Sequence, residues 1–387
     1  MKNFRVLTSG ESHGKCLDAI IEGIPSGIKI DIEFINSELK RRQSGYGRGG
    51  RMKIESDKCE IKSGVRLGLT TGAPICLEIK NKDYENWKVP MSIEEVNLKN
   101  REILKLVADK SFTKVRPGHA DFAGAMKYKL EDLRDVLERS SARQTAIEVA
   151  VGAVAKQILK EFFILGFSHV IQIGKVKAEV LPQSYTLIKE AAERSELRCA
   201  DEVATEMMKE EIDSAREAGD TVGGKFEVIF GNIPVGLGSF VQWDRKLDGK
   251  IAQAVMSIPA VKSVEIGAGN MSAELLGSKM HDEIFIADKK VYRKTNNAGG
   301  IEGGMSNGEA IIVKATMKPI PTMRLPLRTI DIYKKEAATA HFERSDTCAV
   351  PACAVVAEAR IAWVLVDELL EKFGGDSLKE IKSNYEK

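Results

Sequence analysis

Arg116-Pro-Gly-His-Ala-Asp121 and Arg139-Ser-Ser-Ala-Arg143 enclose the segment on which the predicted fold depends. The apolar residues between these motifs recur at helical spacing: Phe122, Met126, Leu130, Leu133, Val136 and Leu137. This spacing predicts one helix of about four turns with one side in the core, and Asp121 is placed to cap its start. His119 at one end and an arginine and hydroxyl cluster at the other suit a large anionic ligand. A capped structural helix with solvated arginines is the open alternative.

The composition is that of a globular protein. The chain has 387 residues, 43% of them hydrophobic, and its net charge of +2 favours neither a nucleic acid nor a membrane partner. Its six cysteines are scattered without zinc spacing, so we expect reduced thiols and no metal. Residues 1–9 hold no apolar run of signal-peptide length, and no window approaches 18 uncharged apolar residues. We therefore expect a soluble cytoplasmic protein.

The first glycine motif, Gly10-Glu-Ser-His-Gly14, follows a short predicted strand over residues 1–8. It matches the nucleophile pattern G-x-S-x-G, in which Ser12 would be the nucleophile of a serine hydrolase. That fold needs an earlier strand and loop to build its oxyanion hole, and nine residues cannot supply them. His13 is therefore the more interesting residue of this motif.

The segment 40–53 is rich in arginine and glycine and contains no acidic residue. It can bring guanidinium groups and backbone N–H groups close to phosphate or carboxylate oxygens. A mobile surface loop and an RNA-binding segment are the alternatives. The second glycine-rich segment, 295–308, has too many glycines for a helix or a plain strand, which indicates a flat cofactor lying against the backbone.

An internal repeat predicts the domain organisation. The matched pairs, in chain order, are 10–14 with 219–223, 24–27 with 233–236, 68–72 with 304–308, and 139–141 with 344–346. Alternating residues in 74–79 and 310–315 predict antiparallel strands in both halves. We expect a single α+β domain of two pseudo-symmetric halves, about 1–170 and 219–373, joined by a charged helical connection over 175–218. His13 is matched by Val222 and Ser141 by Asp346, so the halves divide the chemical roles.

Taken together, these motifs resemble those of the chorismate synthase family over residues 3–373. The matching segments are G-E-S-H-G at 10–14, R-R-Q-S-G-Y-G-R-G-G-R-M at 41–52, R-P-G-H-A-D at 116–121, R-S-S-A-R-Q-T-A at 139–146, N-N-A-G-G-I-E-G-G-M-S-N-G at 296–308, K-P-I-P-T at 318–322 and R-S-D-T-C-A-V-P-A at 344–352. Lys15-Cys16, Gln144 and Cys353 depart slightly from the family pattern.

The resemblance implies a β-α-β sandwich, with helices between two antiparallel sheets, assembled as a homotetramer. It also implies an anti-1,4-elimination of phosphate from 5-enolpyruvylshikimate 3-phosphate to give chorismate, with reduced FMN as cofactor. NADPH as the reductant of the flavin is a further expectation. The alternative function is an RNA-binding module that uses the basic glycine-rich loop.

The resemblance also assigns roles to residues of this chain. His13 would lie near the leaving phosphate, His119 near the N1/O2 side of the flavin, and Asp346, with Ser140 or Ser141, near flavin N5. The implied substrate-binding residues are Arg48, Arg51, Arg116, Arg143 and Arg344. The implied FMN contacts are Arg139, Ser140, Ser141, Gln253, Ala254, Gly303, Lys318, Pro319, Ile320, Pro321, Thr322 and Arg344. Weak NADPH binding through Arg42 and Arg48 is implied as well, and the loops 43–52 and 296–308 are expected to be ordered only with ligand.

Overall fold

Two antiparallel sheets contain most of the strands in the part of the chain that the structure describes. This computed structural model describes residues 3–49, 56–179, 184–343 and 345–387. The first sheet has the strand order β1-β2-β6-β3. Its strands are β1 (Arg5–Gly10), β2 (Cys16–Glu22), β3 (Cys59–Ser63) and β6 (Ile75–Lys80). In β6, Ile75, Leu77 and Ile79 are fully buried and alternate with more exposed residues, as predicted from the sequence.

The second sheet has the order β10-β15-β9-β7-β8, and all its pairs are antiparallel. Its strands are β7 (Leu165–Ile173), β8 (Val176–Lys177), β9 (Gly224–Gly231), β10 (Val261–Ile266) and β15 (Ile311–Met317). The predicted alternation over 310–315 is confirmed, because every second residue of β15 is buried. The predicted α+β class is confirmed by this mixture of sheets and helices.

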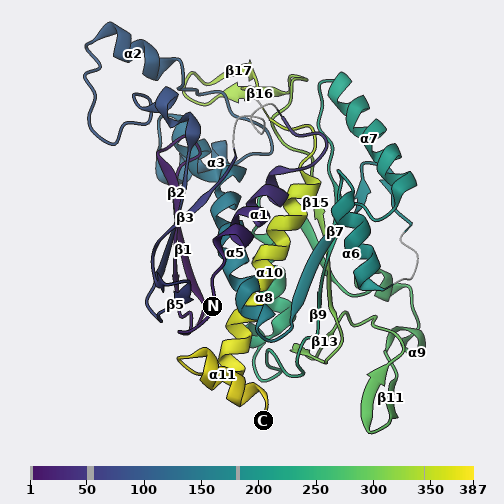
Figure 1. Ribbon diagram of the computed structural model, residues 1–387. Coiled ribbons are helices and arrows are strands. Elements are labelled where there is room, and N and C mark those ends of the chain that lie inside the picture. The colour runs from purple at the N-terminus through teal and green to yellow at the C-terminus, as the bar shows by residue number, and fades with distance from the viewer. Residues whose placement is uncertain (1–2, 50–55, 180–183, 344) are drawn as a thin grey trace.

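Helices α1 (Ile32–Gln43), α5 (Thr145–Lys160), α8 (Leu247–Met256) and α10 (Val350–Phe373) lie between the sheets in Figure 1. Helix α5 packs against β2 and β6, α10 packs against β7 and β9, and the two helices pack against each other. Helix α10 is buried on nearly all sides, because it has sheet on one face and helices on the others.

The remaining elements lie outside this core. Helices α6 (Tyr185–Arg194) and α7 (Glu202–Glu217) cover the outer side of the second sheet (Figure 1). The other described helices are α2 (Arg101–Ala108), α3 (Asp121–Tyr128), α4 (Leu133–Ser140), α9 (Gly277–Met280) and α11 (Leu378–Tyr385). The short hairpins are β4 (Val65–Arg66) with β5 (Leu69–Thr70), β11 (Ile284–Ala287) with β12 (Lys290–Arg293), β13 (Ile301–Glu302) with β14 (Met305–Ser306), and β16 (Arg328–Asp331) with β17 (Glu336–Thr339). No described helix combines the length and apolar character needed to cross a membrane.

The single helix predicted after Asp121 is wrong. The segment forms two helices, α3 and α4, which are separated at Lys129, a residue in the left-handed conformation. The two helices pack against each other, so Phe122 and Met126 stay exposed while Leu133 is buried. Between β2 and α1 the chain forms no further strand, only isolated bridges at Ser26 and Lys29.

Candidate active site

His13 lies in the loop between β1 and β2, and its ring is fixed by two neighbours. Its Nδ1 is 2.8 Å from Oε1 of Glu138, and its backbone N–H donates to Oε2 of the same carboxylate over 2.7 Å. The ring stacks on Trp87, with ring centroids 3.9 Å apart. Only 11% of the His13 side chain is exposed. The imidazole therefore has one defined orientation at the edge of the protein interior.

Asn81 anchors the His13 loop to Arg143. The Asn81 side-chain N–H donates to the carbonyl oxygens of Glu11 and Gly14, over 3.1 and 2.7 Å. Arg143 Nε donates to Oδ1 of Asn81 over 3.0 Å, and its Nη1 bonds both carboxylate oxygens of Asp57. The side-chain amide of Asn81 therefore connects loop 10–14 to Arg143, just before the start of α5.

Arg42, Arg48 and Arg143 lie close enough to influence each other. Arg42 is buried and donates to the Thr145 hydroxyl and the Ala142 carbonyl, both over 2.9 Å. The pKa of Arg42 is lowered to about 10, chiefly by burial; the charges of Arg48 and Arg143 also lower it, while those of Asp57 and Asp346 oppose the shift. Three cations in one place form an environment that favours an anionic ligand.

Asp346 faces this cluster. Its Oδ2 is 2.9 Å from Arg48, and its Oδ1 accepts the backbone N–H of Gly49 over 2.6 Å. Ser140 and Ser141 were expected to lie beside Asp346, but their hydroxyls form hydrogen bonds with other residues. Ser140 donates to the Val136 carbonyl, and the Ser141 hydroxyl accepts the Arg143 backbone N–H. Between the described atoms of these serines and Asp346 there is no direct hydrogen bond.

His119 and Arg116 share the carboxylate of Asp121. Arg116 binds it through Nε and Nη2, over 2.8 and 2.7 Å, and the Nδ1 of His119 is 2.9 Å from Oδ1. Burial raises the Asp121 pKa, but hydrogen bonds from Arg116 and His119 outweigh it and hold that pKa well below its ordinary value. Asp121 is thus not the helix cap that was predicted, because Ala120 takes that position and the carboxylate binds Arg116.

The segment 318–322 lies against the turn at Gly118. Lys318 Nζ donates to the Gly118 carbonyl over 2.6 Å, and a Cβ on Gly118 would lie 3.3 Å from Pro321. The Ser345 hydroxyl donates to the Thr322 carbonyl over 2.9 Å, which joins this segment to Asp346. The Thr322 hydroxyl is itself buried and has no hydrogen-bond partner among the described residues. The His119 region and the Asp346 region are therefore continuous.

Arg139 of α4 and Gln144, at the start of α5, form hydrogen bonds with the end of β1. Arg139 Nη2 donates to the carbonyl and the hydroxyl of Thr8, and Gln144 donates to the Gly10 carbonyl. Gln253 and Ala254 lie on α8, and Gly303 lies in the turn between β13 and β14, which packs against α8. These three predicted flavin contacts form a second region. Arg51 and Arg344 lie outside the described residues.

The glycines of the second glycine-rich segment serve mostly to pack protein against protein. A Cβ on Gly299 would lie 2.4 Å from the Gly267 backbone, and one on Gly300 would lie 2.5 Å from the Ala310 carbonyl. Gly303 differs, because its Cβ position has nothing within 4 Å. The buried Asp282 also accepts the backbone N–H groups of Asn297 and Ala298. Hydrogen bonds within the chain thus hold the first part of this segment against its neighbours.

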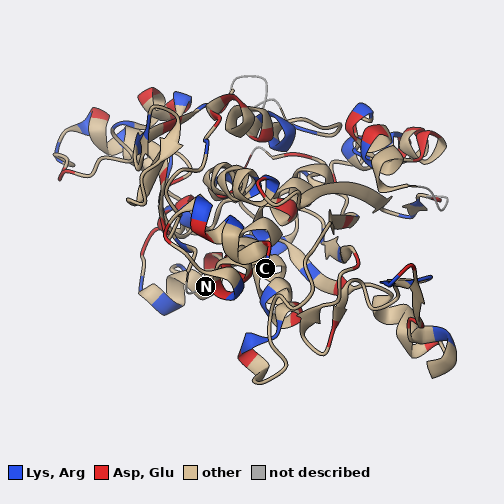
Figure 2. Ribbon diagram, turned by 60° about the horizontal axis from the view of Figure 1, so that its bottom comes forward, with Lys and Arg blue, Asp and Glu red and all other residues tan. Residues whose placement is uncertain are grey.

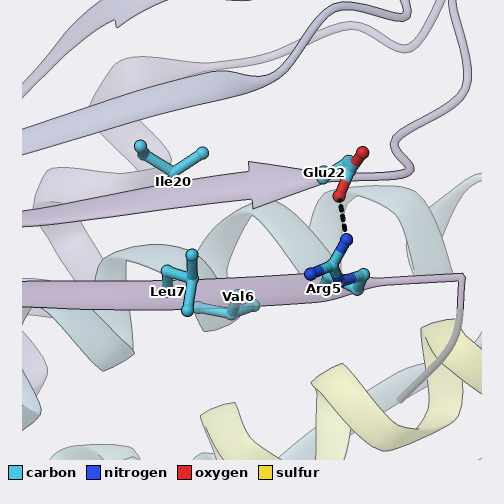
Figure 3. A pocket seen from close by; sticks show the side chains of 5 residues that line it. All are labelled: Arg5, Val6, Leu7, Ile20 and Glu22. Carbon is cyan, nitrogen blue, oxygen red and sulfur yellow. Dashed lines mark hydrogen bonds and ion pairs between the residues drawn. The ribbon is translucent and has the colours of Figure 1, made fainter.

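Two other features lie on the outer side of the first sheet. Arg5, Val6, Leu7, Ile20 and Glu22 line a shallow cavity of about 240 Å³ (Figure 3), where Arg5 pairs with Glu22 over 2.9 Å. Cys16, Asp18 and Glu78 could offer ligand atoms to a metal ion. However, the Cys16 thiol already donates to Asp18, and Glu78 pairs with Lys62 over 3.0 Å. Neither feature contacts the cluster around His13.

Known proteins resemble this chain over nearly its whole length. The family model described as chorismate synthase matches residues 4–370. The chain belongs to the chorismate synthase family. A chorismate synthase from Alkaliphilus metalliredigens is 54% identical over 383 residues, covering 99% of this chain and 98% of the relative. One from Geobacter sulfurreducens is 55% identical over 390 residues, with 99% and 97% covered.

A crystal structure of chorismate synthase superimposes with a TM-score of 0.79 at 42% identity, covering 100% of this chain and 97% of the other. As a member of the chorismate synthase family, the chain is an enzyme, a lyase of the shikimate pathway. The alternative prediction of an RNA-binding module is not supported by these matches. In the view of Figure 2, basic and acidic residues are interspersed along the ribbon.

Sequence reasoning missed several partners in this site: Asp57, Asn81, Trp87, Glu138 and Glu343. None of them lies in a motif that was singled out for its chemistry. The available signal was indirect, because a motif with this many buried cations needs buried acids and amides to balance it.

Proposed function

We propose that this chain converts 5-enolpyruvylshikimate 3-phosphate into chorismate by anti-1,4-elimination of phosphate. The observation that carries the proposal is the grouping of Arg42, Arg48 and Arg143 with Asp346, joined to the His13 loop through Asn81. The substrate has a phosphate and two carboxylates, and guanidinium forks suit both groups. The grouping thus matches the charge of the substrate.

The phosphate end of the substrate would lie at His13. A departing phosphate gains negative charge, and a proton from an imidazole N–H neutralises it. Arg48 and Arg143 would hold its oxygens, together with the predicted contacts Arg51 and Arg344. Arg116 is less suited than Arg48 to bind the substrate on both edges, because one edge of its guanidinium, Nε with Nη2, already binds Asp121. Its more direct contribution is to fix Asp121 beside His119.

Asp346 would help to move the proton that is taken from the substrate ring. Its Oδ2 pairs with Arg48 and its Oδ1 accepts the Gly49 N–H, so both oxygens are oriented before the substrate arrives. A substrate oxyanion that binds Arg48 would weaken this pairing and make the carboxylate a better base. Ser141 keeps the start of α5 in place by capping the short helix at Ala142.

The residues of the 318–322 segment fit reduced FMN. The buried Thr322 hydroxyl lacks a partner among the described residues, and the open space at Gly303 would admit a planar group close to the backbone. His119 would stabilise negative charge on the bound ring, and Lys318 to Pro321, with Arg139 and Ser140, would line the binding site. Bound reduced FMN would supply the electron or base chemistry of the elimination. Gln253 and Ala254 are the remaining predicted contacts, on α8.

A role of NADPH in reducing the flavin is a separate proposal. Arg42 was a predicted NADPH contact, but its Nε and Nη2 bind Thr145 and Ala142 inside the protein. Arg48 is therefore the better of the two predicted contacts.

An anaerobic assay with photoreduced FMN tests the reaction, and the same assay with FMN and NADPH tests self-reduction. We expect His13→Ala and His119→Ala to fold normally and to lose most activity with reduced FMN supplied. Full activity in both variants would reject the proposed roles.

We infer that the architecture is an internally duplicated β-α-β sandwich in one domain. The orders β1-β2-β6-β3 and β7-β9-β15-β10 correspond strand by strand if β9 is the copy of β2 and β15 the copy of β6. This correspondence makes β7 the copy of β1, so the second half would begin near Leu165 and not at 219. Helices α5 and α10 follow the repeated motifs and pack between the sheets. Assembly as a homotetramer is a further proposal, which light scattering on the purified protein tests. The cytoplasmic location remains a prediction.

A further inference from the structure

Glu138 is a buried carboxylate that holds His13 by two hydrogen bonds. It lies in the last turns of α4 and is 1% exposed. One oxygen meets the Nδ1 of His13 at 2.8 Å and the other accepts the His13 backbone N–H at 2.7 Å. An ionised Glu138 accepts a hydrogen bond from Nδ1–H, so in the imidazolium, which carries a proton on each nitrogen, the Nε2 proton is the one left to pass to the leaving phosphate.

Burying a carboxylate is costly unless a cation balances it. Arg134, one turn earlier in α4, lies 3.6 Å from the oxygen of Glu138 that meets His13. The Arg134 guanidinium lies over two aromatic rings, 5.2 Å from Trp87 and 5.1 Å from Phe112. These rings hold it by cation–π attraction. Trp87 thus contacts both His13 and the cation that balances Glu138.

A second carboxylate balances Arg134 in turn. Glu343 accepts from Arg134 Nη2 over 2.7 Å and lies 3.0 Å from Nε2 of His341. Burial raises the pKa of Glu343, but the His341 hydrogen bond and the Arg134 charge outweigh it and lower this pKa to about 2. Contacts between opposite charges therefore connect His13, through Glu138 and Arg134, to Glu343. In the sequence, Glu343 lies two positions before Ser345 and three before Asp346.

We propose that Glu138, balanced by Arg134, is a positioning residue that orients His13 for proton transfer to the leaving group. The proposal rests on the proposed role of His13 in catalysis. Glu138 does not contact the substrate in this scheme. It acts only through the imidazole, so its contribution must disappear when the imidazole is removed.

A double-mutant cycle in the anaerobic assay tests this. We expect Glu138→Ala to lower kcat about 100-fold, within the range of a general acid's contribution, and to change the substrate KM less than about threefold. In a His13→Ala background the same substitution should change kcat less than about twofold, because residues that act as a unit are not additive. Formate, a small carboxylate, should restore part of the kcat of Glu138→Ala and none of that of His13→Ala.

Glu138→Gln keeps the shape of the side chain and should also be impaired, without rescue by formate. Asp367→Asn is a matched control, because Asp367 is likewise buried and accepts backbone N–H groups, those of Asn3 and Phe4. It should keep wild-type kcat. Additive losses in the cycle, or wild-type kcat in both Glu138 variants, would overturn the proposal. Full activity of His13→Ala would instead reject the proposed function of His13, which separates the two failures.

Discussion

The crossing of α5 and α10 offers a sharp test of how the core is packed. Gly152 of α5 faces Ala359 of α10, and both helices are buried there. A Cβ added at Gly152 would lie 2.2 Å from the Ala359 Cβ and 2.6 Å from its Cα. Only a residue without a side chain allows this approach. Gly152→Ala is therefore a minimal perturbation at the closest helix contact.

Two opposing effects set the size of the change. Alanine is favoured over glycine in a helix interior by about 1 kcal/mol. Carbon atoms pack best at about 3.5–4.0 Å, so the helices must separate by more than about 1 Å at the crossing. Overpacking of this kind costs about 1–3 kcal/mol and sometimes more. We expect the steric cost to exceed the propensity gain, with a net destabilisation of about 1–2 kcal/mol.

Gly249→Ala provides the control. Gly249 is also in a helix, α8, but its nearest contact for an added Cβ is a carbonyl oxygen at 4.0 Å. The same substitution should therefore stabilise the protein, by up to about 1 kcal/mol. Urea unfolding at one fixed protein concentration measures both variants. If Gly152→Ala unfolds at the wild-type urea concentration or above, the packing argument is wrong.

Three further predictions concern other parts of the chain. Asn81→Ala should lower the free energy of unfolding by about 2–3 kcal/mol and lower activity, because two loop carbonyls and the Nε of Arg143 lose their hydrogen bonds to the amide. Urea unfolding at the wild-type midpoint would contradict this. Burial raises the pKa of Cys353 and of Cys59 to about 12, so neither thiol should react with a disulfide reagent at pH 8 until urea unfolds the chain. The lowered pKa of Glu343 means that its stabilising contribution is full above about pH 4.5 and is lost as pH falls towards about 2. Glu343→Gln should lower the free energy of unfolding at pH 6 and make that free energy fall less steeply as the pH is lowered from about 4.5 to about 2. An unchanged pH dependence would show that the pair with Arg134 contributes nothing to stability.

The sequence predicted the elements whose pattern is local. Alternation located β6 and β15, and the long apolar segments after Ser141 and Asp346 located α5 and α10. The break at Lys129 was not predictable in this way, since no glycine or proline marks it. It arises because α3 folds back on α4, where a Cβ on Gly124 would lie 2.6 Å from Val136. Packing between helices overrode a continuous helical pattern.

The residues of the site were likewise predicted only in part. The motifs identified His13, His119 and the arginines, because glycine turns and guanidinium groups stand out in a sequence. They could not identify Glu138, which reads as an ordinary charged residue on a helix surface. Asp121 was assigned to the helix cap for the same reason, since only the folded chain shows that Arg116 turns back to bind it. Partners of buried charges are set by the fold and not by neighbours along the chain.

The grouping of Arg42 with Arg48 and Arg143 has a practical consequence for handling the protein. A cluster of guanidinium groups will also attract small oxyanions that have nothing to do with the reaction. Phosphate, sulfate and citrate buffers should thus raise the melting temperature and compete with the substrate, while a zwitterionic buffer of equal ionic strength should do neither. Kinetic constants measured in these two kinds of buffer are accordingly not interchangeable.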